Sequence, residues 1–170
     1  NIIKDEFKLI YNYDLIDHID TRIKEPKSIV KKMEKKKYDK TYLNLIEKIN
    51  DIAGIRIVCT LKDDIFFIRD LVKQMPDIHV LKEKDYVTNP KESGYSSYHM
   101  IVEVPVKLTQ KTIYVKCEIQ IRTLAMDFWA SFEHKVKYKT KNDVNTKMSK
   151  ELVSCAKMIN KFDTKMINYK

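Results

Sequence analysis

Polar and apolar side chains alternate from Ile113 to Arg122, and the polar set carries groups that could do acid–base and phosphate chemistry. A β-strand has a period of two, so it would bury one set and present Lys116, Glu118, Gln120 and Arg122 on one face. A carboxylate on such a face can take a proton, and a guanidinium can bind a phosphate. The same pattern also describes an ordinary solvated strand face, so this segment alone leaves both interpretations open.

A second set of candidates lies in residues 51–60, a β-branched run that predicts a buried strand opened by Asp51. Arg56 is unusual there, because a buried guanidinium needs a carboxylate or a bound phosphate as its partner. Gly54 indicates a close backbone approach. Counting by two puts Asp51 and Arg56 on opposite faces. Either Asp51 precedes the extended part, or Gly54 marks a bulge.

The composition limits the class of protein. A chain of 170 residues with 44% hydrophobic residues predicts one globular domain over residues 1–170. With only 2 glycines and no P-loop or GxGxxG pattern, any phosphate binding must come from side chains. The net charge of +9 favours anionic partners: nucleotides, nucleic acid or acidic membrane surfaces.

Several features bear on the compartment. The sequence contains no apolar run long enough to span a bilayer and no signal peptide. Cys59, Cys117 and Cys155 are widely spaced among apolar residues, which predicts small core residues in a reducing compartment, and we expect a cytoplasmic protein. The chain begins with Asn1 rather than Met, which is consistent with a trimmed N-terminus.

These candidate residues need elements to position them. Helical spacing of apolar residues predicts helices at 2–16, 26–37, 41–49 and 63–75. Strands are expected at 51–60, 78–81, 100–106 and 113–122, with a loop over 82–94. A turn at 108–111 predicts a hairpin between the last two strands, and a regular hairpin would place His99 on the same face as Glu118.

Two further helices are expected towards the C-terminus. Thr123 is a plausible N-cap for a helix whose apolar stripe should pack on the sheet; the stripe is Ala125, Phe128, Trp129, Phe132 and Val136. Residues 146–169 show a heptad seam made of Met148, Leu152, Cys155, Ile159, Phe162, Met166 and Tyr169. The seam fits either packing on the chain's own core or a contact between subunits.

Segments in a fixed order resemble the synthetase domain of the RelA/SpoT homologue family, and more closely its stand-alone small alarmone synthetases. They are Arg22-Ile23-Lys24 with Ser28 and Lys32, DIAGIRIV at 51–58, GYSSYH at 94–99, EIQIRT at 118–123 and AMDFWASFEH at 125–134. Each segment is weak by itself, but together they span nearly the whole chain.

The resemblance implies an α+β fold, with a mixed sheet of about five strands flanked by helices and related to nucleotidyltransferases. It implies transfer of pyrophosphate from ATP to the ribose 3′-hydroxyl of GDP or GTP, giving ppGpp or pppGpp plus AMP as stringent-response signals. It also implies Mg²⁺ as cofactor, because charge gathers where two polyphosphates meet. Small synthetases commonly form homotetramers, which would suit the seam at 146–169.

The resemblance also assigns residues. Glu118 matches the catalytic glutamate and Asp51 the aspartate that binds Mg²⁺, and both are expected near the metal. The positions that match ATP contacts are Arg22, Lys24, Lys32, Arg56 and Lys84. The positions that match contacts to GDP or GTP are Tyr95, Lys91, His99, Gln120 and Arg122. Tyr95 matches the tyrosine that stacks on guanine.

The chain departs from the family pattern at one loop. Where the family often reads Lys-Pro-Asn-Gly-Tyr-Arg-Ser, residues 91–97 read KESGYSS. The loss of an arginine and the gain of Glu92 remove positive charge, so GDP should compete well with GTP. The chain also has no His-Asp dipeptide, which marks the family's hydrolase domain, so we expect no alarmone hydrolysis.

Two other functions remain open from the sequence. One is a catalytically inactive module that binds guanine nucleotides or alarmone, against which the presence of both Asp51 and Glu118 argues. The other is an RNA- or DNA-binding module, suggested by the charge and the 10 tyrosines. The tyrosines are scattered and no RNA-binding fingerprint is present, so we expect nucleic acid only as a regulator.

Overall fold

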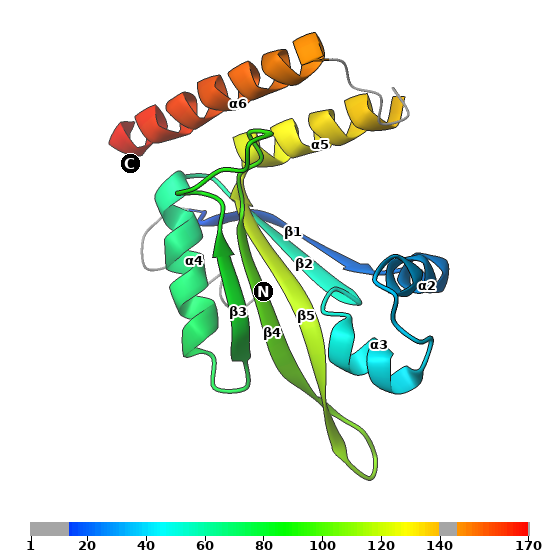
Figure 1. Ribbon diagram of the computed structural model, residues 1–170. Helices are drawn as coiled ribbons and strands as arrows, with labels where there is room; N and C mark the ends of the chain where they lie inside the picture. Colours follow the sequence, from blue (N-terminus) through cyan, green and yellow to red (C-terminus); the bar gives the residue numbers. More distant parts are fainter. Residues whose placement is uncertain (1–13, 140–145, 170) are drawn as a thin grey trace.

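A five-stranded mixed β-sheet forms the centre of the computed structural model, which describes residues 14–139 and 146–169 (Figure 1). The strands are β1 (Ile16–Ile23), β2 (Ala53–Cys59), β3 (His79–Asp85), β4 (Tyr98–Lys107) and β5 (Thr112–Thr123). Their order is β1-β2-β5-β4-β3. β2 and β5 are parallel, and the other neighbouring pairs are antiparallel. The predicted α+β class with five strands is confirmed.

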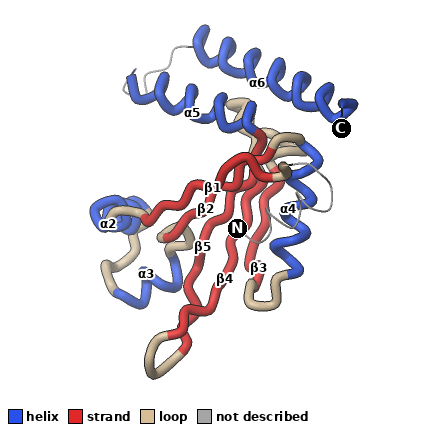
Figure 2. The backbone as a smooth tube through the Cα atoms, turned by 180° about the vertical axis from the view of Figure 1, so that it is seen from behind, coloured by secondary structure: helices blue, strands red, loops and turns tan. Residues whose placement is uncertain are grey.

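The helices gather at three places around the sheet (Figures 1 and 2). They are α2 (Pro26–Lys35), α3 (Tyr42–Lys48), α4 (Lys62–Gln74), α5 (Leu124–Lys139) and α6 (Thr146–Met166), followed by the 3₁₀ helix η1 (Ile167–Tyr169). α4 covers one face, where its apolar residues join those of β4 and β5 in the main core. α2 and α3 lie near the start of β2, and α5 and α6 lie side by side beyond the end of β5.

The main core explains why one sheet face stays polar. Met100, Val102, Ile119 and Ile121 are at most 4% exposed, and they alternate along β4 and β5 with half-buried residues of the opposite parity. Side chains of that opposite parity therefore point away from α4. Within the described residues, no helix is long and apolar enough to cross a bilayer.

Most predicted elements are confirmed, with boundaries shifted by a few residues. The helices at 26–37, 41–49 and 63–75 correspond to α2, α3 and α4, and the hairpin joins β4 to β5 as expected. Residues 82–85 were expected in a loop but belong to β3. The predicted helix at 2–16 lies outside the described residues except for its last three, and Ile16 begins β1.

β1 is an element that the sequence did not predict. Its apolar residues Ile16, Ile19 and Ile23 are three and four apart, which is helical spacing, and most of the strand is exposed. Backbone pairing with β2 decides its conformation, because an edge strand does not need a fully alternating pattern.

The prediction that the α5 stripe packs on the sheet is wrong. Phe128 and Phe132 stack on each other and remain 69% and 49% exposed. Trp129 is buried against Leu152 and Ala156 of α6, and its indole N–H donates to the Leu152 carbonyl over 3.1 Å. Met126, in the first turn of α5, reaches the main core, but the helix then extends past the end of the sheet and α6 covers it there.

Some residues of the α6 heptad seam pack against α5, and others are exposed to solvent. Leu152 and Ile159 pack towards α5, whereas Phe162 is 57% exposed. Ala156 and Asp163 take the buried positions in place of Cys155 and Phe162. The core prediction is therefore confirmed for Cys59 and Cys117, which are buried, and wrong for Cys155, which is exposed.

Candidate active site

The register of the sheet aligns half of the predicted site residues in two rows on the face opposite α4. Directly paired residues of neighbouring strands carry their side chains on the same face. One row is Lys84, His99, Gln120, Arg56 and Asp20, from β3 to β1. The next row is Lys82, Ile101, Glu118, Gly54 and Arg22. The floor of the site is therefore built by strand pairing between segments far apart in the sequence.

Asp51 lies just before β2, and its carboxylate is held by two lysines. Lys24 Nζ is 2.5 Å from Oδ2 and Lys32 Nζ is 2.8 Å from Oδ1. Burial alone would raise the pKa of Asp51, but the hydrogen bonds from the two lysines outweigh it and hold the pKa below its usual value. The pairings of Gly54 with β1 and β5 show no bulge. Asp51 therefore lies before the strand, and the alternative of a bulge at Gly54 is wrong.

Glu118 is held as a carboxylate from both sides. Its Oε1 lies 3.3 Å from His99 Nδ1, and its Oε2 accepts a 3.1 Å hydrogen bond from Gln120 Nε2. The hydrogen bond with His99 lowers the pKa of Glu118 and outweighs both burial and the nearby charge of Asp51. The expected shared face of His99 and Glu118 is thus confirmed.

These contacts belong to a closed ring of side chains. Gln120 Oε1 accepts from Arg122 Nη2 over 2.6 Å, and the same nitrogen lies 3.4 Å from the Tyr95 hydroxyl. The Tyr95 hydroxyl is 2.9 Å from His99 Nε2, which returns the ring to Glu118. A ring of this kind fixes the orientation of its members, because each side chain in it contacts two others.

Two pockets open on this floor. The first, about 210 Å³, we call the arginine pocket; it is lined by Asp20, Thr21, Arg22, Gly54, Ile55, Arg56, Glu118 and Gln120. The second, about 320 Å³, we call the lysine pocket; it is lined by Lys32, Asn50, Asp51, Lys82, Lys84, Tyr86, Lys91, His99, Ile101 and Glu118. Glu118 lines both pockets, so it stands where they meet.

The structure separates some residues that were predicted together. Arg22 and Arg56 line the arginine pocket, but Lys32 and Lys84 line the lysine pocket beside Lys91 and His99. Gln120, matched to an acceptor contact, lines the arginine pocket.

Tyr95 and Arg122 line neither pocket. Arg122 is only 3% exposed, because α5 follows directly and covers the end of β5. The ammonium of Lys91 lies 4.7 Å from the ring centre of Tyr86 and 4.8 Å from that of Tyr95, so the aromatic cluster borders the lysine pocket. Burial raises the pKa of Tyr95 and keeps its hydroxyl protonated.

Sequence reasoning missed Asp127, which approaches the half-buried Arg56 and the buried Arg122. Its Oδ1 lies 3.5 Å from Arg56 Nη1 and 3.4 Å from Arg122 Nη1. In the sequence it is an aspartate in the first turn of a helix, which the helix dipole explains by itself. Lys82 was also missed, because the loop predicted for residues 82–94 gave it no face.

The donor set can be compared with the needs of a metal ion. Among residues 14–139 and 146–169, no group of three or more His, Cys, Asp or Glu is arranged to hold one. Asp51 and Glu118 nevertheless line the same pocket. Mg²⁺ usually takes one or two carboxylates together with substrate phosphates and water, so a two-carboxylate site fits it.

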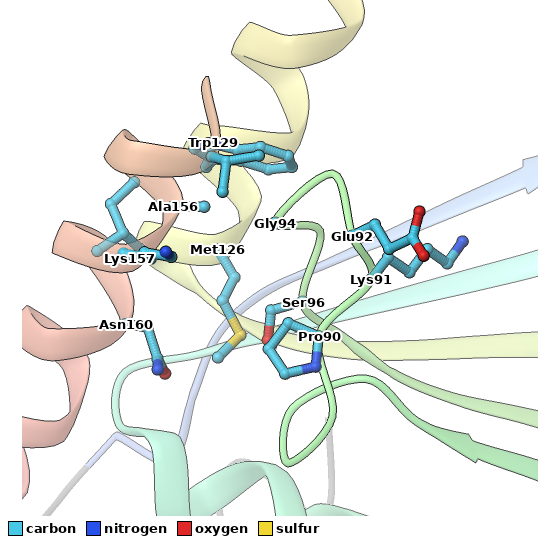
Figure 3. A pocket seen from close by; sticks show the side chains of 12 residues that line it. Pro90, Lys91, Glu92, Gly94, Ser96, Met126, Trp129, Ala156, Lys157 and Asn160 are labelled. Atoms are coloured by element: carbon cyan, nitrogen blue, oxygen red, sulfur yellow. The ribbon is translucent and has the colours of Figure 1, made fainter. Parts of the chain in front are cut away.

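A larger pocket, of about 440 Å³, lies away from this chemistry (Figure 3). Residues 90–96 form one wall, and apolar side chains of α5 and α6, including Met126, Trp129 and Ala156, form the other. Its lining contains neither proposed carboxylate. The two smaller pockets, with their convergent charged groups, are therefore better candidates for a reacting site than this larger apolar one.

Comparison with known proteins shows the family to which the chain belongs. Residues 21–143 match the region found in RelA / SpoT proteins. The GTP pyrophosphokinase YwaC of Bacillus subtilis is 45% identical over 170 residues, all of this chain and 81% of the relative. The GTP pyrophosphokinase YjbM of the same organism is 35% identical over 163 residues, 94% of this chain and 76% of the relative.

Solved structures show the same similarity. The small alarmone synthetase 2 of B. subtilis superposes with a TM-score of 0.89 at 43% identity, covering 99% of this chain and 86% of that one. The small alarmone synthetase 1 of B. subtilis bound to its product pppGpp gives 0.88 at 34% identity, covering 98% and 84%.

Proposed function

Because this chain belongs to the RelA/SpoT family and is a small alarmone synthetase, we propose that its two pockets hold ATP and the guanine nucleotide on either side of Glu118. The reaction is that of a GTP pyrophosphokinase, which moves a pyrophosphate group from ATP to GDP or GTP. The observation that carries the assignment of the site is that Glu118 lines both pockets.

We assign ATP to the arginine pocket. Arg22 and Arg56 offer two guanidinium groups, which can stack on a base and bind phosphate oxygens. The phosphates then extend past Glu118 towards Lys24 and Lys32, whose ammonium groups surround Asp51. A cation-lined path suits the group being transferred, because its negative charge must be stabilised throughout the reaction.

We assign the guanine nucleotide to the lysine pocket. His99, Lys84 and Lys91 line it, and Tyr86 and Tyr95 supply aromatic surface at its border. Lysine side chains can bind the 5′ phosphates, and an aromatic ring can stack on the base. Glu118 would then face the ribose hydroxyl.

The chemistry requires an oxygen nucleophile and a leaving group. The 3′-oxygen of the acceptor bonds to the β-phosphorus of ATP, and the bond from that phosphorus to the oxygen shared with the α-phosphate breaks, releasing AMP. The hydroxyl proton passes to Glu118, whose carboxylate His99 and Gln120 keep ionised and oriented before the reaction. Its lowered pKa means that Glu118 is ionised at neutral pH and free to accept that proton.

A divalent cation completes the charge balance. Asp51 and Glu118 are the residues that would hold Mg²⁺. When bound, the cation would neutralise phosphate charge as it develops.

The test is to incubate the protein with Mg²⁺, γ-labelled ATP and GDP or GTP, and to resolve the labelled nucleotides. Glu118→Gln should lower kcat at least about a hundredfold, because an amide cannot accept the proton. Glu103→Gln is the matched control, since Glu103 lies on the same strand face as His99 but lines neither pocket. Absence of tetraphosphate or pentaphosphate from the wild type, or full activity in Glu118→Gln, would contradict the proposal.

We also propose that the protein forms a homo-oligomer through α5 and α6. Exposed apolar side chains follow one stripe on each helix, namely Leu124, Phe128 and Phe132 on α5 and Met158 and Phe162 on α6. Monomeric proteins rarely expose contiguous apolar surface of this kind. Light scattering should give a mass of at least twice the 20.3 kDa of one chain. Phe128→Lys combined with Phe162→Lys should lower it, and a monomeric wild type would refute the proposal.

A further inference from the structure

We propose that Asp127, at the start of α5, is a positioning residue for pyrophosphate transfer. It holds Arg56 in the arginine pocket and anchors Arg122 behind Glu118. This inference rests on the proposed function of that site. Nothing in the sequence distinguishes Asp127 from other acids in the first turn of a helix, and only the fold brings it to the two arginines.

The geometry places one carboxylate between two guanidinium groups. Asp127 Oδ1 lies 3.5 Å from Arg56 Nη1 and 3.4 Å from Arg122 Nη1. The side chain of Asp127 is 19% exposed, that of Arg122 is 4% exposed and that of Arg56 is 34% exposed. The contact is therefore shielded from water on the side of Arg122 and open to the pocket on the side of Arg56.

The electrostatics explain why an acid is needed there. Burial lowers the pKa of Arg122, the nearby charge of Arg56 lowers it further, and the charge of Asp127 opposes both effects. Nε of both arginines and Oδ1 of Asp127 are buried without a hydrogen-bond partner among the described residues, so Asp127 acts on the arginines through its charge. Arg56 Nη1 also lies 3.7 Å from Asp20 Oδ2, but the Asp20 side chain is 59% exposed, so water screens the attraction between the two charges. Asp127 is thus the better shielded counter-charge for Arg56.

The influence of Asp127 extends to Glu118 through two short steps. Arg122 Nη2 donates to Gln120 Oε1 over 2.6 Å, and Gln120 Nε2 donates to Glu118 Oε2 over 3.1 Å. If the carboxylate of Asp127 is lost, Arg122 becomes a buried cation without its counter-charge, and its orientation is less defined. The amide oxygen of Gln120 then loses a donor of fixed position, and the Gln120 N–H that donates to Glu118 is held less firmly.

The test compares Asp127→Asn, Asp127→Glu and the wild type in steady-state kinetics with ATP and GDP varied separately. Asp127→Asn keeps the size of the side chain but removes its charge. We expect it to raise the KM for ATP about tenfold and to lower kcat about tenfold, with the KM for GDP changed less than about twofold. Asp127→Glu restores the charge and should recover part of both losses.

Glu133→Gln is the matched control. It makes the same chemical change on the same helix, where Glu133 pairs with Lys137 four residues later, and it should leave both KM values and kcat unchanged. Thermal unfolding of each variant separates positioning from folding, because a purely structural loss lowers the active fraction without changing the KM for ATP.

Two results would overturn the inference. One is an unchanged KM for ATP in Asp127→Asn, whatever happens to its stability. The other is an equal shift in Glu133→Gln. Neither result would affect the proposed function, which fails only if the wild type makes no product or if Glu118→Gln remains active.

Discussion

Gly94 lies so close to Ala156 that a Cβ built at position 94 would be 2.4 Å from the Ala156 Cβ. Gly94 also has a φ of +90°, which side chains rarely adopt. The loop that carries Lys91 and Tyr95 is thereby attached to α6 at one point. The same loop contacts α6 through Gly94 and lines the lysine pocket through Lys91, so the position of α6 can affect the proposed acceptor site.

Gly94→Ala should lower the free energy of unfolding by about 1–3 kcal/mol, because it combines backbone strain with overlap against α6. The displaced loop should also raise the KM for GDP, measured in the assay with γ-labelled ATP. Adding Ala156→Gly removes the overlap but not the strained φ, so it should recover only part of the stability. Gly54→Ala is the control, because a Cβ there meets Arg22 at 3.5 Å, an ordinary contact, and stability should hold.

Lys24→Met should destabilise the protein by about 1 kcal/mol at neutral pH, since Lys32 still pairs with Asp51. Despite burial, the two lysines hold the pKa of Asp51 below 3.8 in the folded state. A carboxyl whose pKa falls on folding contributes stability above its unfolded pKa and loses that contribution as the pH falls through the folded pKa.

The difference between wild type and Lys24→Met should therefore be constant around neutral pH and shrink as the pH falls below 3.8. Urea unfolding at a series of pH values measures it. Lys40→Met, which removes an exposed pair with Glu34, should have almost no effect at any pH. A difference that grows on acidification would show that another group, not Asp51, responds to the lysine.

Two substitutions at Tyr95 separate its ring from its hydroxyl. Tyr95→Phe removes the hydroxyl that contacts His99 and Arg122 but keeps the aromatic face. We expect a several-fold lower kcat with little change in the KM for GDP. Tyr95→Ala also removes the ring, and the KM for GDP should rise about tenfold or more, as base stacking is worth about 1–3 kcal/mol. Equal KM values for both variants would exclude stacking on the acceptor.

Glu92 lets the acceptor preference be tested. It is an exposed acid next to Lys91, so it weakens the positive field that an extra 5′ phosphate would meet. We expect wild-type kcat/KM for GDP to be at least equal to that for GTP, and Glu92→Gln to shift the ratio towards GTP. A strong preference of the wild type for GTP would contradict this prediction.

Part of the side-chain ring could be predicted from the sequence and part could not. The ring consists of Glu118, Gln120, Arg122, Tyr95 and His99. Alternation in β4 and β5 and the short turn between them correctly predicted that His99 and Glu118 share a face. The same alternation predicted Arg122 at the surface of the site, but α5 covers the end of the strand and buries it. The alternation along a strand predicts which face of the sheet a side chain is on. Whether that side chain is buried depends on which other element covers that part of the face.

The sequence by itself determined the polar strand face, the hairpin that pairs His99 with Glu118, the cap at Thr123 and the sheet-and-helix class, because these follow from period and turn chemistry along contiguous residues. Only the tertiary structure decided the edge strand β1, the placing of α6 over Trp129, and the contact of Asp127 with Arg56 and Arg122. Each of these joins segments far apart in the chain, and such contacts depend on how the whole sheet and its helices pack.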